Sequence, residues 1–310
     1  MSHVLIVGAG AIGAFYGAIL KRAGWRVSVV LRSEYQVVAE YGFTFTHSPL
    51  GDLSWRPDGV YRDGDVLTDA ADYVVLTSKV LDDLDRGALL RPWLAPHSRI
   101  VLIQNGLDIE RAVAEALPQH ELISAIAFVG VSRTAPGELV HNSYGHLSLG
   151  CYPSGISDSV TALAQALEQG GIAAKAVDNV VRERWLKSVW NAPFNPLSVL
   201  GNGADTVQML DAPGAESLVR ALMAEVLAVA SAEGHDFPPN LIDAQIAGTR
   251  KMPGYRNSMA LDYLAGRPIE LQAILGNIVD IAARHQLAVP HLQTVLTALR
   301  IRQWPAAQPV

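Results

Sequence analysis

Three polar side chains recur at helical spacing between residues 183 and 197. Lys187, Asn191 and Asn195 follow one another at intervals of four residues, so an α-helix would place all three on one face. An ammonium beside a ketone oxygen could stabilise the negative charge that develops during hydride addition and donate the proton. The asparagines offer donors and acceptors for a hydroxyl or a carboxylate. We expect this polar row to line a cleft, because the rest of the segment is mostly large and apolar: Trp185, Leu186, Val189, Trp190 and Phe194.

A second candidate site is a glycine-rich sequence between a short apolar strand, Val4–Val7, and an apolar helical run that ends near Gly24. In such a loop one glycine permits the tight turn, one lets the backbone approach a pyrophosphate, and one allows the helix to pack closely on the strand. The amino end of the helix adds unpaired N–H groups and a positive dipole end. We therefore predict that the loop binds a dinucleotide through Gly8, Ala9, Gly10, Ala11, Ile12 and Gly13.

The residues after the second predicted strand bear on the choice between NAD and NADP. In NAD sites an acidic residue at this point accepts a hydrogen bond from the ribose 2′-hydroxyl. Here the strand Val27–Leu31 leads into Arg32 and Ser33, and a guanidinium can pair with a 2′-phosphate through two N–H groups. The pattern favours NADPH. A solvated charge at the strand end is the alternative interpretation of Arg32.

Polar loops follow two further predicted strands. Lys79 ends the loop at residues 77–79, and Asn105 lies in the loop at residues 104–106. Ligands of open α/β sheets bind beyond the carboxyl ends of the strands, so both loops should lie on the cofactor side. We expect Lys79 to contact a phosphate or a carboxylate, and Asn105 to contact the nicotinamide ribose or the substrate. Taken singly, each could be an ordinary loop residue.

Hydrophobic periodicity divides the chain in two. In the first half, short β-branched runs alternate with helical stretches, which is typical of a parallel sheet covered by helices, and closely spaced segments after residue 122 predict antiparallel hairpins added to it. From Val180 onward the patterns predict helices only. We therefore predict an α/β Rossmann-type dinucleotide-binding domain over residues 1–178 and an all-α domain over residues 179–310. The expected strands and main helices are Val4–Val7, Val27–Leu31, Tyr73–Thr77, Ile100–Ile103, Ser124–Ser132, Glu138–Asn142, His146–Leu149 and Ile172–Val177, with helices at Ser157–Gln169, Ala215–Glu233 and Pro268–His285.

Composition limits the class of ligand. The net charge is −6 with no block of lysines or arginines, which argues against nucleic acid, so a few placed cations must hold any small anion. No apolar stretch reaches about 18 residues and the amino terminus lacks a signal-peptide pattern, so we expect a cytoplasmic protein that does not enter membranes. Cys151 is the only cysteine and the histidines lack metal-site spacing. We expect no metal site, and we interpret Cys151 as buried filler.

In combination, these motifs resemble the ketopantoate reductase (2-dehydropantoate 2-reductase) family. The resemblance covers nearly the whole chain and adds Asn257-Ser258-Met259 and, after Gly266-Arg267, Glu270. It implies a Rossmann domain followed by a helical domain, NADPH as the cofactor and a small anionic 2-oxo acid as the substrate. It also implies the family's roles for the matching residues: Lys187 as proton donor, Asn191, Asn195 and Ser258 as substrate ligands, Glu270 near the nicotinamide ribose and the reacting centre, Lys79 and Asn105 as contacts of cofactor and substrate, and Arg32 as ligand of the 2′-phosphate.

Two of these residues also have structural interpretations. Ser258 could cap a helix, because hydroxyls are common at that position. Glu270 falls in the first turn of the helix predicted from Pro268, where a carboxylate favours the helix dipole without any ligand.

Departures from the family pattern leave the substrate open. Pro193 predicts a kink between the two asparagines. Gln272 and Leu275 replace an Asp and an Asn found in many family members, and Asp205 is not assigned a role. The leading hypothesis is reduction of 2-dehydropantoate to (R)-pantoate with NADPH. The alternatives are another branched or aromatic 2-oxo acid, a β-hydroxyacid dehydrogenase, and a dinucleotide-sensing regulator without turnover. The apolar helices of the second domain could also form a homodimer surface.

Overall fold

In the computed structural model, which describes residues 1–303, the chain forms two compact units. Unit 1 comprises Met1–Lys79, Leu84–Asn105 and Ile109–Glu183. Unit 2 comprises the chain from Arg184 onward together with Val80–Asp83 and Gly106–Asp108. Two short segments of the first half of the chain therefore belong to unit 2. One directly follows Lys79 and the other directly follows Asn105.

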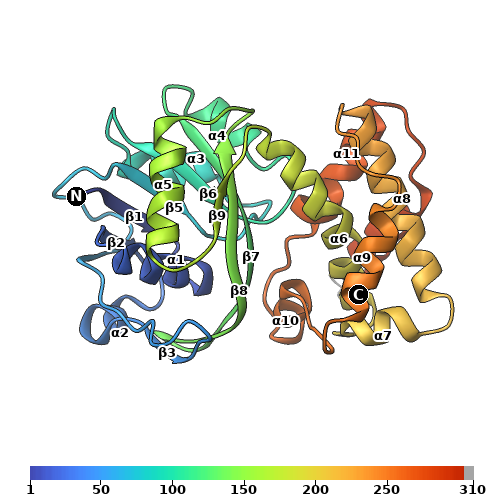
Figure 1. The fold of residues 1–310 in the computed structure, drawn as a ribbon, viewed down its shortest axis with the longest axis horizontal. Coiled ribbons are helices and arrows are strands. Elements are labelled where there is room, and N and C mark those ends of the chain that lie inside the picture. The colour runs from blue at the N-terminus through green and yellow to red at the C-terminus, as the bar shows by residue number, and fades with distance from the viewer. Residues whose placement is uncertain (304–310) are drawn as a thin grey trace, which may run out of the picture. The chain divides into compact units, whose positions relative to one another are not determined.

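A mixed sheet of nine strands forms the centre of unit 1 (Figure 1). Its strands are His3–Val7 (β1), Arg26–Val30 (β2), Thr44–His47 (β3), Gly59–Tyr61 (β4), Tyr73–Leu76 (β5), Arg99–Ile103 (β6), Leu122–Ala135 (β7), Glu138–Cys151 (β8) and Ala174–Ala176 (β9). β4, β2, β1, β5, β6 and β7 lie in that order and run parallel. The near-continuous apolar runs predict this for β1, β2, β5 and β6, whereas the parallel pairing of β7 with β6 was not predicted. β8 runs antiparallel to β7, which confirms the predicted extension of the sheet, and β3 and β9 pair with β8.

The antiparallel part differs in detail from the prediction. Two strands of 14 residues each, β7 and β8, replace the three shorter segments expected there. The prediction ended a strand before Gly145, but β8 continues through Tyr144 and Gly145, whose φ angles are 61° and 131°. The pairing shifts register between Phe128 and Val129 of β7. A bulge therefore accommodates the glycine that resembles a turn in the sequence.

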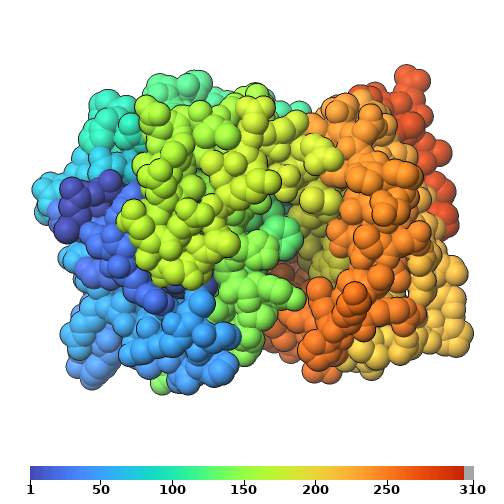
Figure 2. Space-filling model, viewed as in Figure 1, coloured from blue at the N-terminus to red at the C-terminus, as the bar shows by residue number. Residues whose placement is uncertain are grey.

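The helices of unit 1 include two that lie together on the near face of the sheet, α1 and α5 (Figure 1). The helices span Ala11–Arg22 (α1), Tyr35–Tyr41 (α2), Arg86–Leu90 (α3), Arg111–Ala116 (α4) and Asp158–Gln169 (α5). α5 matches its prediction and begins where Ser157 Oγ accepts a hydrogen bond from the Val160 N–H at 3.1 Å. Its outer face forms part of the near surface of unit 1 (Figure 2). β3, β4 and the shorter helices were not predicted, because segments of three to seven residues carry too little periodicity.

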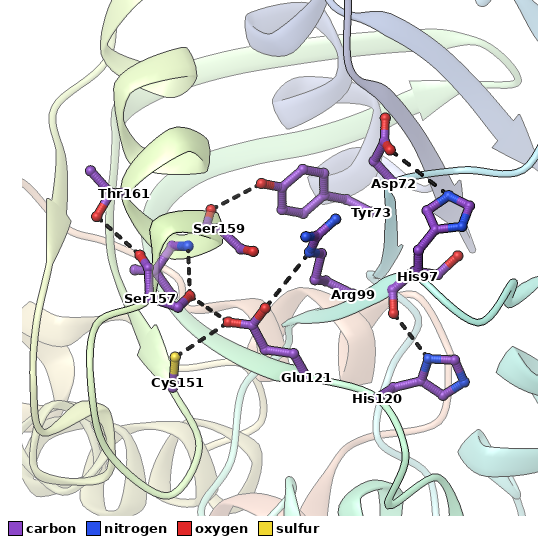
Figure 3. A network of polar contacts seen from close by, with 12 residues as sticks. Asp72, Tyr73, His97, Arg99, His120, Glu121, Cys151, Ser157, Ser159 and Thr161 are labelled. Carbon is purple, nitrogen blue, oxygen red and sulfur yellow. Dashed lines mark hydrogen bonds and ion pairs between the residues drawn. The ribbon is translucent and has the colours of Figure 1, made fainter.

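A polar network lies at the amino ends of β5 and β6 (Figure 3). Glu121, just before β7, accepts a hydrogen bond from Ser157 Oγ and lies 3.7 Å from Arg99 Nε. Cys151 Sγ donates to the same carboxylate at 3.5 Å. Cys151, interpreted as buried filler, is only partly buried, and its thiol takes part in this network. The network ties the start of α5 to the sheet, at the edge opposite the glycine-rich loop.

Unit 2 contains helices and loops but no strand between Arg184 and residue 303, as predicted. The helices are Val180–Leu200 (α6, which begins in unit 1), Thr206–Asp211 (α7), Ala215–Ala232 (α8), Leu241–Arg250 (α9), Ser258–Leu264 (α10), Asn277–Arg284 (α11) and Pro290–Gln303 (α12), with a π-helical turn (η2) at Gln272–Gly276. α8 confirms its prediction and is followed by Gly234 at φ 82°. Within residues 1–303, no helix is both long and apolar enough to span a membrane.

Two helical predictions in unit 2 need correction or refinement. The helix predicted from Pro268 begins only at Leu271 and opens with the π-helical turn, so Glu270 precedes the helix instead of lying in its first turn. The Gln272 side chain lies against Gly276, where an added Cβ would come within 2.3 Å of it, and this close packing accompanies the wide turn. α6 continues through Pro193 for 21 residues, so that proline does not end the helix.

Candidate active site

The glycine-rich loop between β1 and α1 gives each glycine a separate task. Gly8 has φ +79°, a conformation that glycine adopts without steric cost. Gly10 directly precedes α1 with no capping side chain, and a Cβ there would meet nothing nearer than the Gly8 carbonyl oxygen at 4.0 Å. A Cβ at Gly13 would lie only 2.6 Å from Thr77 Oγ1 and 2.8 Å from a methyl of Ile6. Open space at Gly10 and the free amino end of α1 fit a pyrophosphate.

The other residues of the loop act through their backbone. Ala9 is buried, and Ala11 and Ile12 are partly buried in the first turn of α1. Thr77, which follows β5, fixes the loop from the neighbouring strand, since its Oγ1 donates to the Gly8 carbonyl at 2.8 Å. The loop is therefore fixed by a contact from the neighbouring strand end.

Sequence reasoning missed a second residue that stabilises this region, Gln104. Its Nε2 donates to the Ser78 carbonyl at 2.6 Å, and Arg86 Nη1 donates to its Oε1 at 3.3 Å. Ser78 in turn lies against Gly8, where a Cβ would come within 3.1 Å of it. The buried Gln104 and Arg86 thus connect the loops after β5 and β6 to the glycine loop. The position of Gln104 at the end of an apolar strand was the only signal in the sequence.

Arg32 is exposed just beyond β2, next to the exposed Ser33. Two residues on, Glu34 carries a carboxylate, but this side chain is 6% exposed and turned to other partners. It forms an ion pair with Arg133 and accepts a hydrogen bond from the Gly137 N–H at 3.0 Å. The accessible side chains at this strand end are therefore a guanidinium and a hydroxyl.

Lys79 and Asn105 are partly buried at the loops after β5 and β6. Each is the last residue of unit 1 before a short segment that belongs to unit 2. The parallel pairing of β5 with β6 brings the two loops to the same edge of the sheet as the glycine loop. This arrangement agrees with their predicted placement on the cofactor side, while their contacts with a ligand stay predictions.

Lys187 is partly buried on α6 in unit 2. Burial and, to a smaller extent, the nearby positive charge of Arg184 lower the pKa of its ammonium, whereas the carboxylate of Glu270 raises it; the net result is a pKa of about 7. A lysine in this environment exchanges a proton near neutral pH. This environment is compatible with a proton donor, and that role of Lys187 stays a prediction.

Glu270 is held by a residue distant in sequence. Its Oε1 accepts a hydrogen bond from the Val80 N–H at 2.9 Å, a contact across 190 residues, and the side chain is 9% exposed. Glu270 directly precedes the helix instead of lying in its first turn, so its carboxylate is still near the positive end of the helix dipole, but that carboxylate also binds a loop amide. Val80 directly follows Lys79, so the two candidate residues are connected through one peptide.

Sequence reasoning also missed Arg184, which precedes Lys187 by three residues on α6. It is 3% exposed, and its Nη1 donates to the Gly106 carbonyl at 3.1 Å. Gly106 directly follows Asn105, so this contact parallels the one between Glu270 and Val80. The spacing of three residues from Lys187 was a usable signal, since it places both cations on one face of α6.

The asparagine row continues from Lys187 along α6. Asn191 is partly buried, and Asn195 is 2% exposed. Asn195 Oδ1 is buried without a hydrogen-bond partner, whereas its carbonyl accepts from Ser198 Oγ at 2.6 Å. Buried acceptors are rarely left unsatisfied, so this oxygen is suited to accept a hydrogen bond from a bound ligand. Trp185, Val189 and Phe194 are at most 1% exposed, as their apolar pattern predicted.

Ser258 is exposed in the first turn of α10 and does not cap it. The cap is Asn257, whose Oδ1 accepts from the Ala260 N–H at 2.9 Å. Asn257 Nδ2 also donates to the Phe194 carbonyl at 3.2 Å, which ties α10 to α6 beside Asn195. Because Asn257 performs the capping, the Ser258 hydroxyl is available for a ligand.

The residues that depart from the family pattern have structural roles. Asp205 caps α7 in a reciprocal arrangement with Gln208, so it serves the helix. Gln272 Nε2 donates to Asp280 Oδ2 at 2.7 Å, and Leu275 is fully buried. Within residues 1–303, no three His, Cys, Asp or Glu side chains are grouped so that they could hold a metal ion.

The sequence is similar to a known protein family over both parts of the chain. Residues 4–154 match the family described as Ketopantoate reductase PanE/ApbA, and residues 179–303 match its C-terminal domain. The 2-dehydropantoate 2-reductase of Nostoc sp. (strain PCC 7120) is 32% identical over 300 residues, which cover 95% of this chain and 93% of that protein.

Solved structures show the same two-part architecture. A 2-dehydropantoate 2-reductase from Methylococcus capsulatus is 45% identical with a TM-score of 0.93, and the match covers 99% of both chains. Another from Geobacter metallireducens GS-15 is 31% identical with a TM-score of 0.89, covering 97% of this chain and 100% of that one. These matches confirm both the predicted fold class and the resemblance.

Proposed function

The chain belongs to the ketopantoate reductase family, and on this premise we propose that it reduces 2-dehydropantoate to (R)-pantoate with NADPH, with Lys187 as the proton donor. The observation that carries the proposal is the environment of Lys187, whose pKa is lowered to about 7. A lysine with that pKa is part ammonium and part amine at neutral pH, which suits proton donation in reduction and proton removal in the reverse reaction.

The side chains of unit 2 would divide the work on the substrate. As negative charge develops on the keto oxygen, the Lys187 ammonium stabilises it and transfers its proton there. Asn195 Oδ1 gains from the substrate hydroxyl the hydrogen bond that it lacks. Asn191 and Ser258 provide further polar contacts, the latter to the carboxylate. Glu270, fixed by the Val80 N–H, acts near the reacting centre and keeps part of the Lys187 population protonated.

The dinucleotide would be held mainly by residues 1–178, and the substrate by residues 179–310. The backbone from Gly8 to Gly13 accommodates the pyrophosphate, and Lys79 and Asn105 contact the cofactor from the next two strand ends. The open space at Gly10 supports this assignment. When bound, the nicotinamide supplies the hydride, while the chain orients the ketone and supplies the proton.

Preference for NADPH over NADH is proposed to rest on Arg32. Its exposed guanidinium would pair with the 2′-phosphate, and the nearby Glu34 carboxylate is occupied by Arg133 and Gly137. We expect Arg32→Ala to weaken NADPH binding by about 10-fold or more and to leave NADH binding nearly unchanged, since one charge-assisted contact is lost. Fluorescence titration with both cofactors measures this, and equal losses would remove Arg32 from the site.

Substrate identity is tested by steady-state rates with NADPH over a panel of oxo acids. We expect the highest kcat/KM for 2-dehydropantoate. A higher value for another branched or aromatic 2-oxo acid would transfer the assignment to that acid and keep the chemistry. Turnover of 3-hydroxy acids would instead indicate a β-hydroxyacid dehydrogenase. Binding of NADPH without turnover of any of these compounds would indicate a dinucleotide-sensing regulator.

A further inference from the structure

A second arginine, Arg62, directly follows β4, the strand that lies next to β2. β2 is the strand that leads to Arg32. β4 pairs in parallel with β2, and Val30 is in register with Tyr61. The Leu31 N–H donates to the Tyr61 carbonyl at 2.9 Å, so the two chains remain paired to the last residue of β4. Arg62 follows at once, level with Leu31. Adjacent strands are about 5 Å apart, so the backbone of Arg62 lies about one strand spacing from the residue before Arg32.

We propose that Arg62 is a second specificity-determining residue, which binds the 2′-phosphate of NADPH together with Arg32. This inference rests on the proposed function, because it concerns the phosphate that separates NADPH from NADH. Nothing in the sequence signalled it, since Arg62 lies 30 positions beyond Arg32 and follows a strand of three residues.

The side chain of Arg62 is already turned toward the segment that carries Arg32. Its guanidinium lies 4.2 Å from the centre of the Tyr35 ring, and Tyr35 is the first residue of α2, three positions after Arg32. Arg62 is also exposed, so binding an anion would not require breaking a buried contact. Stacking on the ring restricts the guanidinium to this side of the strand end and leaves its N–H edge able to bind a ligand.

The turn after β4 also carries two exposed carboxylates, Asp63 and Asp65, so Arg62 is not an isolated positive charge. The carboxylate of Asp65 accepts a hydrogen bond from the backbone N–H of Arg62 at 2.7 Å, so it stabilises the turn after β4. Glu34 is paired with Arg133. A 2′-phosphate carries close to two negative charges, and two guanidinium groups from neighbouring strand ends can neutralise it better than one.

The test measures binding of four ligands to the full-length protein and to three variants. NADPH and 2′,5′-ADP carry the phosphate, whereas NADH and 5′-AMP lack it. The variants are Arg62→Gln, Arg32→Gln and, as a matched control, Arg22→Gln, because Arg22 lies in the last turn of α1 and so at the other edge of the sheet. Calorimetry gives each dissociation constant, and thermal melting checks that each variant folds.

We expect Arg62→Gln to weaken NADPH and 2′,5′-ADP roughly tenfold, the size of one charge-assisted hydrogen bond, and to change NADH and 5′-AMP less than about twofold. Arg22→Gln should change the binding of none of the four ligands. The inference is overturned if Arg62→Gln keeps the preference for NADPH while Arg32→Gln loses it, and the proposed function then stands. Wild-type protein that binds NADPH no more tightly than NADH would contradict the proposed cofactor itself, and with it this inference.

Discussion

The glycine loop of unit 1 presents mainly backbone groups to a ligand, whereas the polar row of unit 2 presents side chains. The loop has small residues that leave room beside its backbone. Hydrogen bonds of Thr77 and Gln104, at the ends of adjacent strands, hold the loop and its neighbouring segment in place. The polar row consists of side chains, and the pKa of its one charged member, Lys187, depends on the charges of Arg184 and Glu270. Glu270 in turn is held by the amide of Val80, which is distant in sequence. Substitutions in the loop should therefore act through shape, and substitutions in the row through charge and hydrogen bonding.

The largest effect is expected in the polar row. Lys187→Ala should lower kcat by on the order of 10²-fold or more, because it removes both the proton donor and the charge that stabilises the alkoxide. The binding of NADPH should remain near the wild-type value, since the loop is intact. Lys251→Ala is the matched control, because Lys251 is exposed at the end of α9 and should keep wild-type rates. Single-turnover rates of NADPH oxidation measure the difference, and a Lys187→Ala variant with the control's rate would refute the assignment.

In the loop, alanine at two glycines should separate binding from folding. Gly10→Ala places a Cβ in open space where the pyrophosphate would lie, so NADPH binding should weaken tenfold or more, about 1.4 kcal/mol, with little change in stability. Gly13→Ala forces a Cβ against Thr77 and Ile6 and should destabilise unit 1 by about 1–3 kcal/mol. Urea unfolding and cofactor titration check both. The reverse pattern would show that the two glycines have been assigned the wrong tasks.

A smaller difference is expected between Asn195 and Asn257, one of which should affect substrate binding and the other stability. Asn195→Leu removes a buried acceptor that has no partner, so the free energy of unfolding should change by less than about 1 kcal/mol, while KM for the oxo acid should rise about tenfold. Asn257→Leu removes a helix cap and a buried hydrogen bond and should cost about 2 kcal/mol of stability. Thermal melts and steady-state kinetics distinguish them. An Asn195→Leu variant with normal KM and reduced stability would make Asn195 structural.

The same contrast explains what the sequence could predict. The glycine loop and the strands β1, β2, β5 and β6 depend on local patterns, so residue type and spacing were sufficient. Glu270 was placed in a helix because the run from Pro268 looks helical, but its carboxylate binds the Val80 amide 190 residues away. No local pattern contains that contact. Arg184 and Gln104 were missed for the same reason, since their partners lie in other segments of the chain.

Other features were not predicted because the element is short or because two adjacent residues are both suited to the same capping position. β4 has three residues, too few for a periodic signal, so the place of Arg62 beside β2 was not foreseen. Ser258 and Asn257 are both good caps by type, and only the structure shows that Asn257 takes the position. Gly145 looked like a turn, but the bulge in β8 uses its positive φ within a continuous strand.

The pH dependence of kcat/KM tests the central claim most directly, because it reports the protonation of Lys187 in the free enzyme. Burial and Arg184 lower the pKa of Lys187 to about 7, so the ammonium needed for reduction is lost above that pH. We predict that kcat/KM for reduction is level below pH 7 and falls about tenfold per pH unit well above it, while the reverse oxidation rises through the same range. Lys187→Arg, which cannot lose its proton in this range, should be slower and lack the fall. A wild-type profile that stays flat from about pH 6 to pH 9 would contradict the assignment of Lys187 as the proton donor.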